Sequence, residues 1–234
     1  MQYLRITMST LTAIGFVLGS DLARAEPPMQ VDDAGTLGRG GMKLEGSLSR
    51  DDKQRAGDLV FGFSVIENVE IGLALARATD RADSPSTRLA GVGIGIKWVP
   101  IQEREGWSLG VSLDHGRTRV DERATPAKFT ERAYGLTGLA TYRWDDGQAG
   151  HVNLGVSRIR AQGEGETVGT WGLGYEYPLT DALKLTAELF GEEHARPAKA
   201  LGLRYQVFEG FKLSGAIGRG DGRSFGQVGF AWEF

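Results

Sequence analysis

The stretch Val-Glu-Ile-Gly-Leu-Ala-Leu-Ala, residues 69–76, carries the pattern that decides the fold. Its large apolar residues fall at every second position, and Glu, Gly or Ala stands between them. A period of two is that of a β-strand, whereas an amphipathic helix repeats every 3.6 residues. The same alternation recurs from Gly41 to the C-terminus. The sequence therefore predicts an all-β protein.

The alternation on either side of this stretch divides the chain into twelve segments of about ten residues each. They lie near 42–50, 57–66, 69–78, 89–99, 107–116, 132–144, 150–158, 168–177, 183–192, 199–207, 211–219 and 224–234. An even number of strands places both chain ends on one side of a membrane, as in bacterial single-chain barrels. We therefore expect a transmembrane antiparallel up-and-down β-barrel of 12 strands over residues 42–234.

The aromatic residues distinguish a membrane barrel from a soluble one. They share the parity of the apolar face and gather at the strand ends nearest the tightest connections. Such a girdle suits a headgroup boundary, which is apolar on one side and wet on the other. The apolar face should thus point outward into lipid. The predicted girdle consists of Trp98, Trp107, Tyr142, Trp144, Tyr175, Tyr177, Tyr205, Phe211, Trp232 and Phe234.

The connections are predicted to alternate in length. Those after even-numbered strands are mostly tight and should be periplasmic, while those after odd-numbered strands are longer and should face outward. The longest, 117–131, is a candidate for surface recognition or for an inward fold that narrows the mouth. The prolines of the barrel are all expected in connections, where no ladder hydrogen bond is lost.

The first 25 residues resemble an export signal. A short apolar stretch, 6–19, is followed by Ala23-Arg24-Ala25, a small-x-small cleavage site. It falls short of the roughly 20 residues that a membrane anchor needs. The mature chain would begin at Glu26. Residues 26–41 contain a Pro pair, an acidic pair and several glycines, and we expect a periplasmic lead or a plug folded into the lumen.

Composition excludes several functions. The formal net charge of −3 gives no basic footprint for nucleic acid, and the absence of cysteine removes disulfides and thiol nucleophiles. The 35 glycines are spread through the chain, which disfavours helices. We expect no cofactor, and no metal site either, because the neighbours Glu192, Glu193 and His194 cannot all point to one face of a strand.

The inward face is where a function should be visible. Its charges are of both signs, which favours pairs across a narrow lumen over the one-sided ring of a charge-selective channel. Two interpretations stay open: these residues are structural ion pairs, or some of them contact a solute. The lumen candidates are Lys43, Glu45, Asp58, Glu70, Lys97, Asp114, Arg143, His151, Glu176, Lys184, Glu188, Arg204 and Lys212. Glycines on the same face would leave room for passage: Gly91, Gly93, Gly95, Gly110, Gly172 and Gly174.

An enzymatic role is the remote alternative, since one known twelve-stranded barrel is a phospholipase. Such a site needs a serine and a histidine within hydrogen-bond reach on the lipid face. His115 has the outward parity, but no serine stands at matching height beside it. His151 is expected in the lumen and His194 in an outer loop. We therefore expect no catalysis.

The last strand ends in Phe234 after a clear alternation of apolar and small residues. With the export signal, this favours recognition by the barrel assembly machinery and insertion into the outer membrane of a Gram-negative bacterium. The expected partners are thus outer-membrane lipid, the assembly machinery and a small solute.

Several phrases of the mature chain resemble the outer-membrane transporter family named for the meta-cleavage pathway of phenol degradation. They are Asp33-Ala34-Gly35-Thr36-Leu37 with Lys43-Leu44-Glu45, the phrase 175–181 leading to Glu188, and 201–205. Residues 66–68 depart from the family's usual turn. The resemblance implies a passive channel for small hydrophobic or aromatic compounds and brings no catalytic residue. A structural or surface-interaction barrel with a closed lumen is the alternative.

Overall fold

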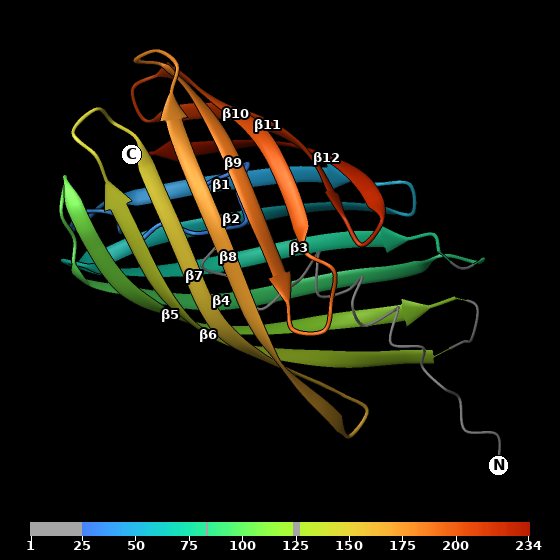
Figure 1. The fold of residues 1–234 in the computed structure, drawn as a ribbon. Coiled ribbons are helices and arrows are strands. Elements are labelled where there is room, and N and C mark those ends of the chain that lie inside the picture. Colours follow the sequence, from blue (N-terminus) through green and yellow to red (C-terminus); the bar gives the residue numbers. More distant parts are fainter. Residues whose placement is uncertain (1–24, 83, 124–126) are drawn as a thin grey trace.

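The computed structural model describes residues 25–82, 84–123 and 127–234. They form a closed barrel of twelve antiparallel strands, which confirms the predicted fold class (Figure 1). The strands are β1 Met42–Arg50, β2 Gln54–Ile66, β3 Val69–Asp80, β4 Thr87–Ile101, β5 Gly106–Glu122, β6 Ala127–Arg143, β7 Ala149–Ala161, β8 Glu164–Pro178, β9 Leu183–Glu192, β10 Ala198–Phe208, β11 Phe211–Gly220 and β12 Arg223–Glu233.

Each strand pairs with its neighbours in the chain, and β1 pairs with β12 to close the ring. At the seam Leu44 lies opposite Trp232. The C-terminal residue extends the ladder, since Phe234 N–H donates to Met42 O at 2.9 Å and Met42 N–H donates to Phe234 O at 3.1 Å. Closure leaves no unpaired sheet edge, which a barrel in lipid requires.

The alternation seen in the sequence becomes an outside and an inside. On β3 the large residues Leu73 and Leu75 are 46% and 60% exposed, whereas Glu70 and Ala74, at positions of the opposite parity, are 7% and 6% exposed. The apolar side chains therefore point outward, the reverse of a water-soluble core. No helix in the described ranges is long and apolar enough to cross a membrane.

The strands are longer than the sequence predicts, mostly at one end of the barrel. β5 and β6 each have 17 residues, so most of the expected loop 117–131 is a hairpin of paired strands. The predicted long loop is wrong, and with it the prediction that connections after odd-numbered strands are the longer ones. Arginines in 117–132 suggested a loop because they interrupt the apolar alternation, yet they continue the outward face of the strands.

The two ends of the barrel can be told apart by the chain termini. We call the end where β1 begins and β12 finishes the terminal end, and the opposite end the distal end. Two prolines depart from the expected positions at the terminal end: Pro100 lies within β4 and Pro178 is the last residue of β8. Pro100 is tolerated because the pairing with β5 shifts register between Trp98 and Ile101.

Candidate functional site: the lumen and its N-terminal segment

The N-terminal segment, residues 25–41, lies inside the barrel and follows its wall. From the start of β1 it crosses to β3, where Leu37 N–H donates to Glu70 Oε2, and then to β6, where Ala34 N–H donates to Thr141 Oγ1. It continues past β7, β9 and β10 toward the β12 wall. The expected export signal falls on residues 1–24, outside the described ranges.

Lumen side chains satisfy the backbone of this segment where no strand does. The Glu188 carboxylate accepts the N–H groups of Gln30 at 2.7 Å and Val31 at 3.1 Å. Asn153 bonds Asp32 twice: its Oδ1 accepts the Asp32 N–H at 2.7 Å, and its Nδ2 donates to the Asp32 carbonyl at 2.8 Å. Because buried amides and carbonyls must be paired, these contacts specify one path for the chain.

The acidic pair of the segment binds two cations of the wall. Asp32 Oδ2 lies 2.6 Å from Lys97 Nζ, and Asp33 Oδ2 accepts a hydrogen bond from Arg143 Nη2 at 2.6 Å. Burial raises the pKa of the Asp33 carboxyl, but the Lys97 and Arg143 cations lower that pKa by more, so it lies below its usual value. Asp33 therefore stays ionised in its place.

Arg204 on β10 holds the start of the segment. Its guanidinium donates to Pro27 O at 3.0 Å through Nε and to Glu26 O at 2.6 Å through Nη2. The remaining nitrogen, Nη1, donates to Glu176 Oε1 at 2.6 Å. Lys212 Nζ contacts Glu26 Oε2 at 2.8 Å. Arg204 Nε also lies 3.2 Å from Glu26 Oε1, so the charge of Arg204 is shared between the Glu176 carboxylate of the wall and the Glu26 carboxylate and two carbonyls of the segment.

Inward-facing glycines give the segment its space. A Cβ on Gly172 would come within 2.8 Å of Val31 Cγ2, and one on Gly174 within 2.7 Å of Met29 Cε. The same holds for two glycines on β10 and β12, Gly202 against Pro28 and Gly229 against Pro27. Gly172 and Gly174 were expected to clear a path for a solute, whereas in the structure that space is filled by the protein's own chain.

Two small apolar clusters add to the polar contacts. Ala34 of the segment is fully buried against Val99 of β4 and Leu139 of β6. Farther along, Met29 and Val31 pack with Ala25, and Phe190 of β9 lies against them. The apolar side chains Val99 and Leu139 point into the lumen, and Ala34 of the segment packs against them.

All the lumen candidates have the inward parity. Eight are buried (Glu45, Glu70, Lys97, Asp114, His151, Glu176, Glu188 and Arg204) and five are half-buried (Lys43, Asp58, Arg143, Lys184 and Lys212). Several pair with each other on the wall: Lys43 lies 2.8 Å from Glu70 Oε1, and Lys184 lies 2.9 Å from Glu176 Oε2. Others instead meet the N-terminal segment.

Some residues of this site were not predicted from the sequence. Thr141 and Asn153 accept backbone N–H groups of the segment, and Gly202 and Gly229 leave room for it. Nothing in their local pattern separates them from other small or polar lumen residues. The acidic pair before the first strand is a signal that could have indicated the contact with Lys97 and Arg143, but no partner was predicted for it from the sequence.

The three histidines lie in different environments. His115 Nδ1 lies 3.1 Å from Ala133 O, its ring packs on Tyr134, and its cross-strand neighbours are Ile94 and Tyr134. His151 is buried in the lumen, with Nδ1 3.0 Å from Thr141 Oγ1. His194 is exposed in the β9–β10 connection.

The aromatic side chains of the terminal end form an outward band. Ring centroids of Trp107 and Tyr142 lie 5.1 Å apart, those of Tyr142 and Trp144 4.9 Å, and those of Trp144 and Tyr175 6.3 Å. On the C-terminal strand Trp232 packs on Phe234 at 4.9 Å. The rings thus contact one another across strands along one rim.

A cavity of about 450 Å³ at this end is lined both by the segment and by the wall. Both acidic and basic side chains line it, among them Glu26, Asp33, Arg143, Glu176 and Lys212.

Comparisons with known proteins agree on the fold. The family model described as "Uncharacterised conserved protein UCP029691" matches residues 14–224, and it does not name the meta-cleavage transporters that the sequence resembles. No curated protein matches the chain.

Among solved structures, the COG4313 outer membrane channel from Pseudomonas putida F1 superimposes with a TM-score of 0.63 at 10% identity, covering 86% of this chain and 98% of that one. The KdgM porin in complex with disordered oligogalacturonate gives 0.62 at 12% identity, covering 82% and 99%. The translocator domain of autotransporter NalP from Neisseria meningitidis gives 0.60 at 16% identity, covering 85% and 90%. At these identities the likeness shows an outer-membrane β-barrel fold.

Proposed function

Because the chain belongs to the family described as "Uncharacterised conserved protein UCP029691", whose description states no activity, we propose a function from the structure. The protein is an outer-membrane channel for small solutes, and its N-terminal segment closes the lumen at the periplasmic end. The terminal end faces the periplasm and the distal end faces the outside. Removal of the export signal near Ala25 would leave Glu26 as the first residue.

The observation that carries this proposal is the path of the segment. Residues 26–37 contact the walls of β3, β4, β6, β7, β9, β10 and β11 through hydrogen bonds and ion pairs. A chain that lies inside the lumen against these strands occupies space that water and ions would need. It is held by many separate contacts and by no regular strand pairing, so it can be released without unfolding the barrel.

The class of solute rests on the sequence resemblance to the meta-cleavage transporters, which implies hydrophobic or aromatic compounds. The channel-like neighbours KdgM and the COG4313 protein support passage in general terms. We propose no catalytic role: the cross-strand neighbours of the outward-facing His115 are Ile94 and Tyr134, so no serine stands directly beside it.

The direct test is single-channel conductance of the mature chain, residues 26–234, in planar bilayers. The intact protein is expected to be closed for most of the recording, while a variant lacking residues 26–36 should give steady ohmic steps. The deletion keeps Gly40 and Gly41, whose backbone bonds to Ser64 anchor the start of β1. Heat-modifiable migration on gels verifies that both barrels are folded.

A disulfide lock provides the matched control. The chain contains no cysteine, so cysteines at Ala34 and Leu139, which pack together, would form a unique pair. Openings of the oxidised variant should disappear and return on reduction. A folded deletion variant that stays silent would support the closed-lumen barrel instead, and an intact protein that conducts like the deletion would exclude closure by the segment.

A further inference from the structure

The distal outer face carries basic residues on strand positions that point away from the lumen. Arg77 on β3, Arg117 and Arg119 on β5, and Arg132 on β6 are all exposed. Within the described part of the chain, none of the four lies within ion-pair distance of a carboxylate. Exposed arginines at a water-facing rim are ordinary, but their mutual arrangement is not.

The register aligns these cations in two adjacent rows. In the first, Arg77 lies opposite Ala90, and Ala90 lies opposite Arg119. In the second, Arg117 lies opposite Arg132, which in turn lies opposite Arg160 on β7. Directly opposed side chains stand about 5 Å apart at Cβ, and like charges there repel. A bound anion would remove that cost.

The first row also contains a gap of suitable size. Ala90 has only a methyl group, so Arg77 and Arg119 flank an open position with their strands roughly 10 Å apart. This gap belongs to an outward groove of about 1440 Å³. Arg77, Arg117 and Arg119 line the groove together with apolar side chains of the neighbouring strands.

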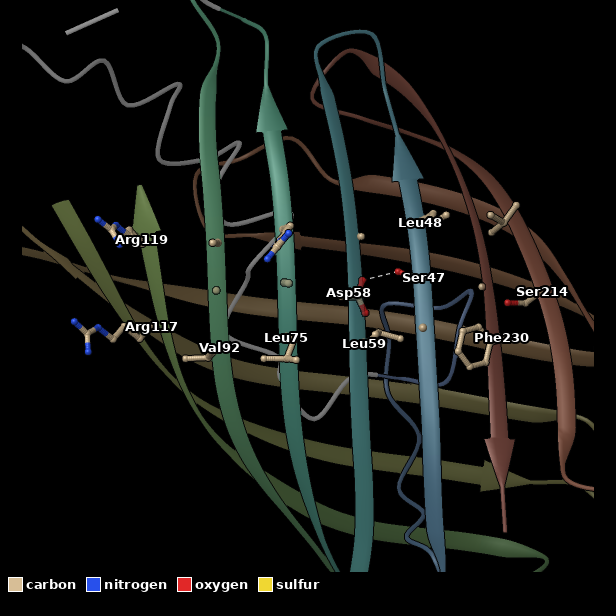
Figure 2. Close-up of a pocket in the computed structure, with 18 of the residues that line it drawn as sticks. Ser47, Leu48, Asp58, Leu59, Leu75, Val92, Arg117, Arg119, Ser214 and Phe230 are labelled. Atoms are coloured by element: carbon tan, nitrogen blue, oxygen red, sulfur yellow. Dashed lines mark hydrogen bonds between the residues drawn. The ribbon is translucent and has the colours of Figure 1, made fainter. Parts of the chain in front are cut away.

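The apolar part of the groove lies next to the basic part, on the side of the terminal end. Leu75 lies opposite Leu59 on β2 and opposite Val92 on β4, one row nearer the terminal end than Arg77. Figure 2 shows Leu59, Leu75 and Val92 on adjacent strands, beside Arg117. A groove with cations at one edge and leucine and valine below it fits an amphiphile with an anionic head and acyl chains.

The position of the basic rows along the membrane normal is suitable for binding a lipid headgroup. Arg77 is eight positions along β3 from Val69, which pairs with Trp98 of the aromatic band. That corresponds to about 26 Å along the strand, or about 20 Å of height at the usual tilt of barrel strands. The apolar band of such barrels is about 25 Å tall, so the Arg77 backbone lies a few ångströms short of the opposite headgroup boundary. The long arginine side chain spans that difference, because its apolar stem can lie in the lipid while the guanidinium extends to the headgroups.

We propose that this groove binds a lipid of the outer leaflet whose headgroup carries two phosphates. One phosphate lies between Arg77 and Arg119 over Ala90, a second contacts the row of Arg117 and Arg132, and the acyl chains lie along Leu59, Leu75 and Val92. Arginine is suited to this role because its planar fork binds phosphate oxygens in pairs.

The test is native mass spectrometry of the purified full barrel in detergent, titrated with diphosphoryl lipid A. The variant Arg77→Gln/Arg119→Gln should weaken binding about tenfold or more, since each cation near a lipid headgroup contributes substantially. Ala90→Trp should weaken binding similarly without changing charge, because it fills the gap. The matched control is Lys199→Gln/Arg219→Gln, an exposed, directly opposed basic pair on β10 and β11.

The control variant should bind within about twofold of the unmodified protein. Equal loss in both double variants would overturn the local site in favour of a general charge effect. Equal binding of a lipid without phosphate would also overturn it. Displacement of the lipid by millimolar inorganic phosphate alone would show a simple anion site and would contradict the lipid assignment. Gel migration of each folded barrel verifies that loss of binding is not loss of structure.

Discussion

Arg204 inside the barrel and Arg119 on its outer face are both arginines on barrel strands, yet their surroundings differ. Arg204 is 8% exposed, and its guanidinium contacts Glu176 and two carbonyls of the N-terminal segment. Arg119 is exposed, and the described residues supply it with no acidic partner. The first charge is satisfied within the chain, and the second is available to a ligand.

The difference follows from the two environments of the barrel wall, which are the narrow lumen on the inside and the lipid headgroups on the outside. A charge in a narrow lumen loses most of its water and must find partners in the protein. A charge at the outer headgroup boundary keeps water and meets lipid phosphates. The same residue type therefore stabilises the N-terminal segment on one face and serves recognition on the other.

The largest effect is expected from the removal of the Arg204 side chain. Arg204→Ala would leave Glu176 and two carbonyls of the segment without their main donor, so we expect unfolding to become easier by about 3 kcal/mol. The measurement is urea unfolding of the refolded barrel in lipid vesicles. Arg119→Ala is the matched control and should change unfolding little. Equal effects would show that water in the lumen replaces the lost donor.

A smaller effect is expected from filling the space that Gly172 leaves. Gly172→Val would place a Cβ 2.8 Å from Val31 Cγ2 and disfavour the docked segment by about 1–3 kcal/mol. A cysteine at Met29, which is 3% exposed, reports release of the segment through its rate of maleimide labelling. We expect labelling to accelerate roughly tenfold.

The control for this prediction is Gly138→Val. Gly138 is exposed on β6, and a Cβ there would have its nearest neighbour, Leu154 O, at 3.6 Å. Labelling should then stay at the rate of the parent cysteine variant. Unchanged labelling in Gly172→Val would mean that Val31 yields without releasing the segment.

The fold could be predicted from the sequence because strand parity in a membrane barrel is a local property. Each stretch such as 69–76 shows its two faces independently of the rest of the chain. The distal strand ends could not be located because outward arginines in 117–132 replace apolar residues beyond the lipid boundary. The side chains there still alternate between the inner and outer faces, but the outward residues are no longer apolar, so the sequence pattern is lost.

The course of the N-terminal segment could be predicted only in outline. Its partners are separated by long stretches of chain, as with Asp32 and Asn153 or Gln30 and Glu188. Most of these contacts join backbone amides to side chains, or place chain against glycines, and neither leaves a residue pattern. The composition of residues 26–41 left a periplasmic lead and a lumen plug as equal alternatives, and it gave no partner for the acidic pair of residues 32 and 33.

The smallest expected effect is that of an exposed Lys–Asp pair, which can be compared with a buried pair of the same chemistry. Lys97 and Asp32 lie 2.6 Å apart with side chains 3% and 5% exposed, whereas Lys128 and Asp121 lie 3.7 Å apart and are 61% and 40% exposed. Double-mutant cycles with Lys→Met and Asp→Asn should give a coupling energy of about 2 kcal/mol for the inner pair. The outer pair should give less than about 0.5 kcal/mol.

Added salt should increase the difference between the two coupling energies, because ions screen exposed charges and hardly reach buried ones. Repeating both cycles at high ionic strength should abolish the outer coupling and leave most of the inner one. Equal couplings at both sites, or equal loss in salt, would mean that the lumen is wet enough to screen Lys97. The N-terminal segment would then be held by its backbone hydrogen bonds and by the glycine-lined space, and its charges would serve only to align it.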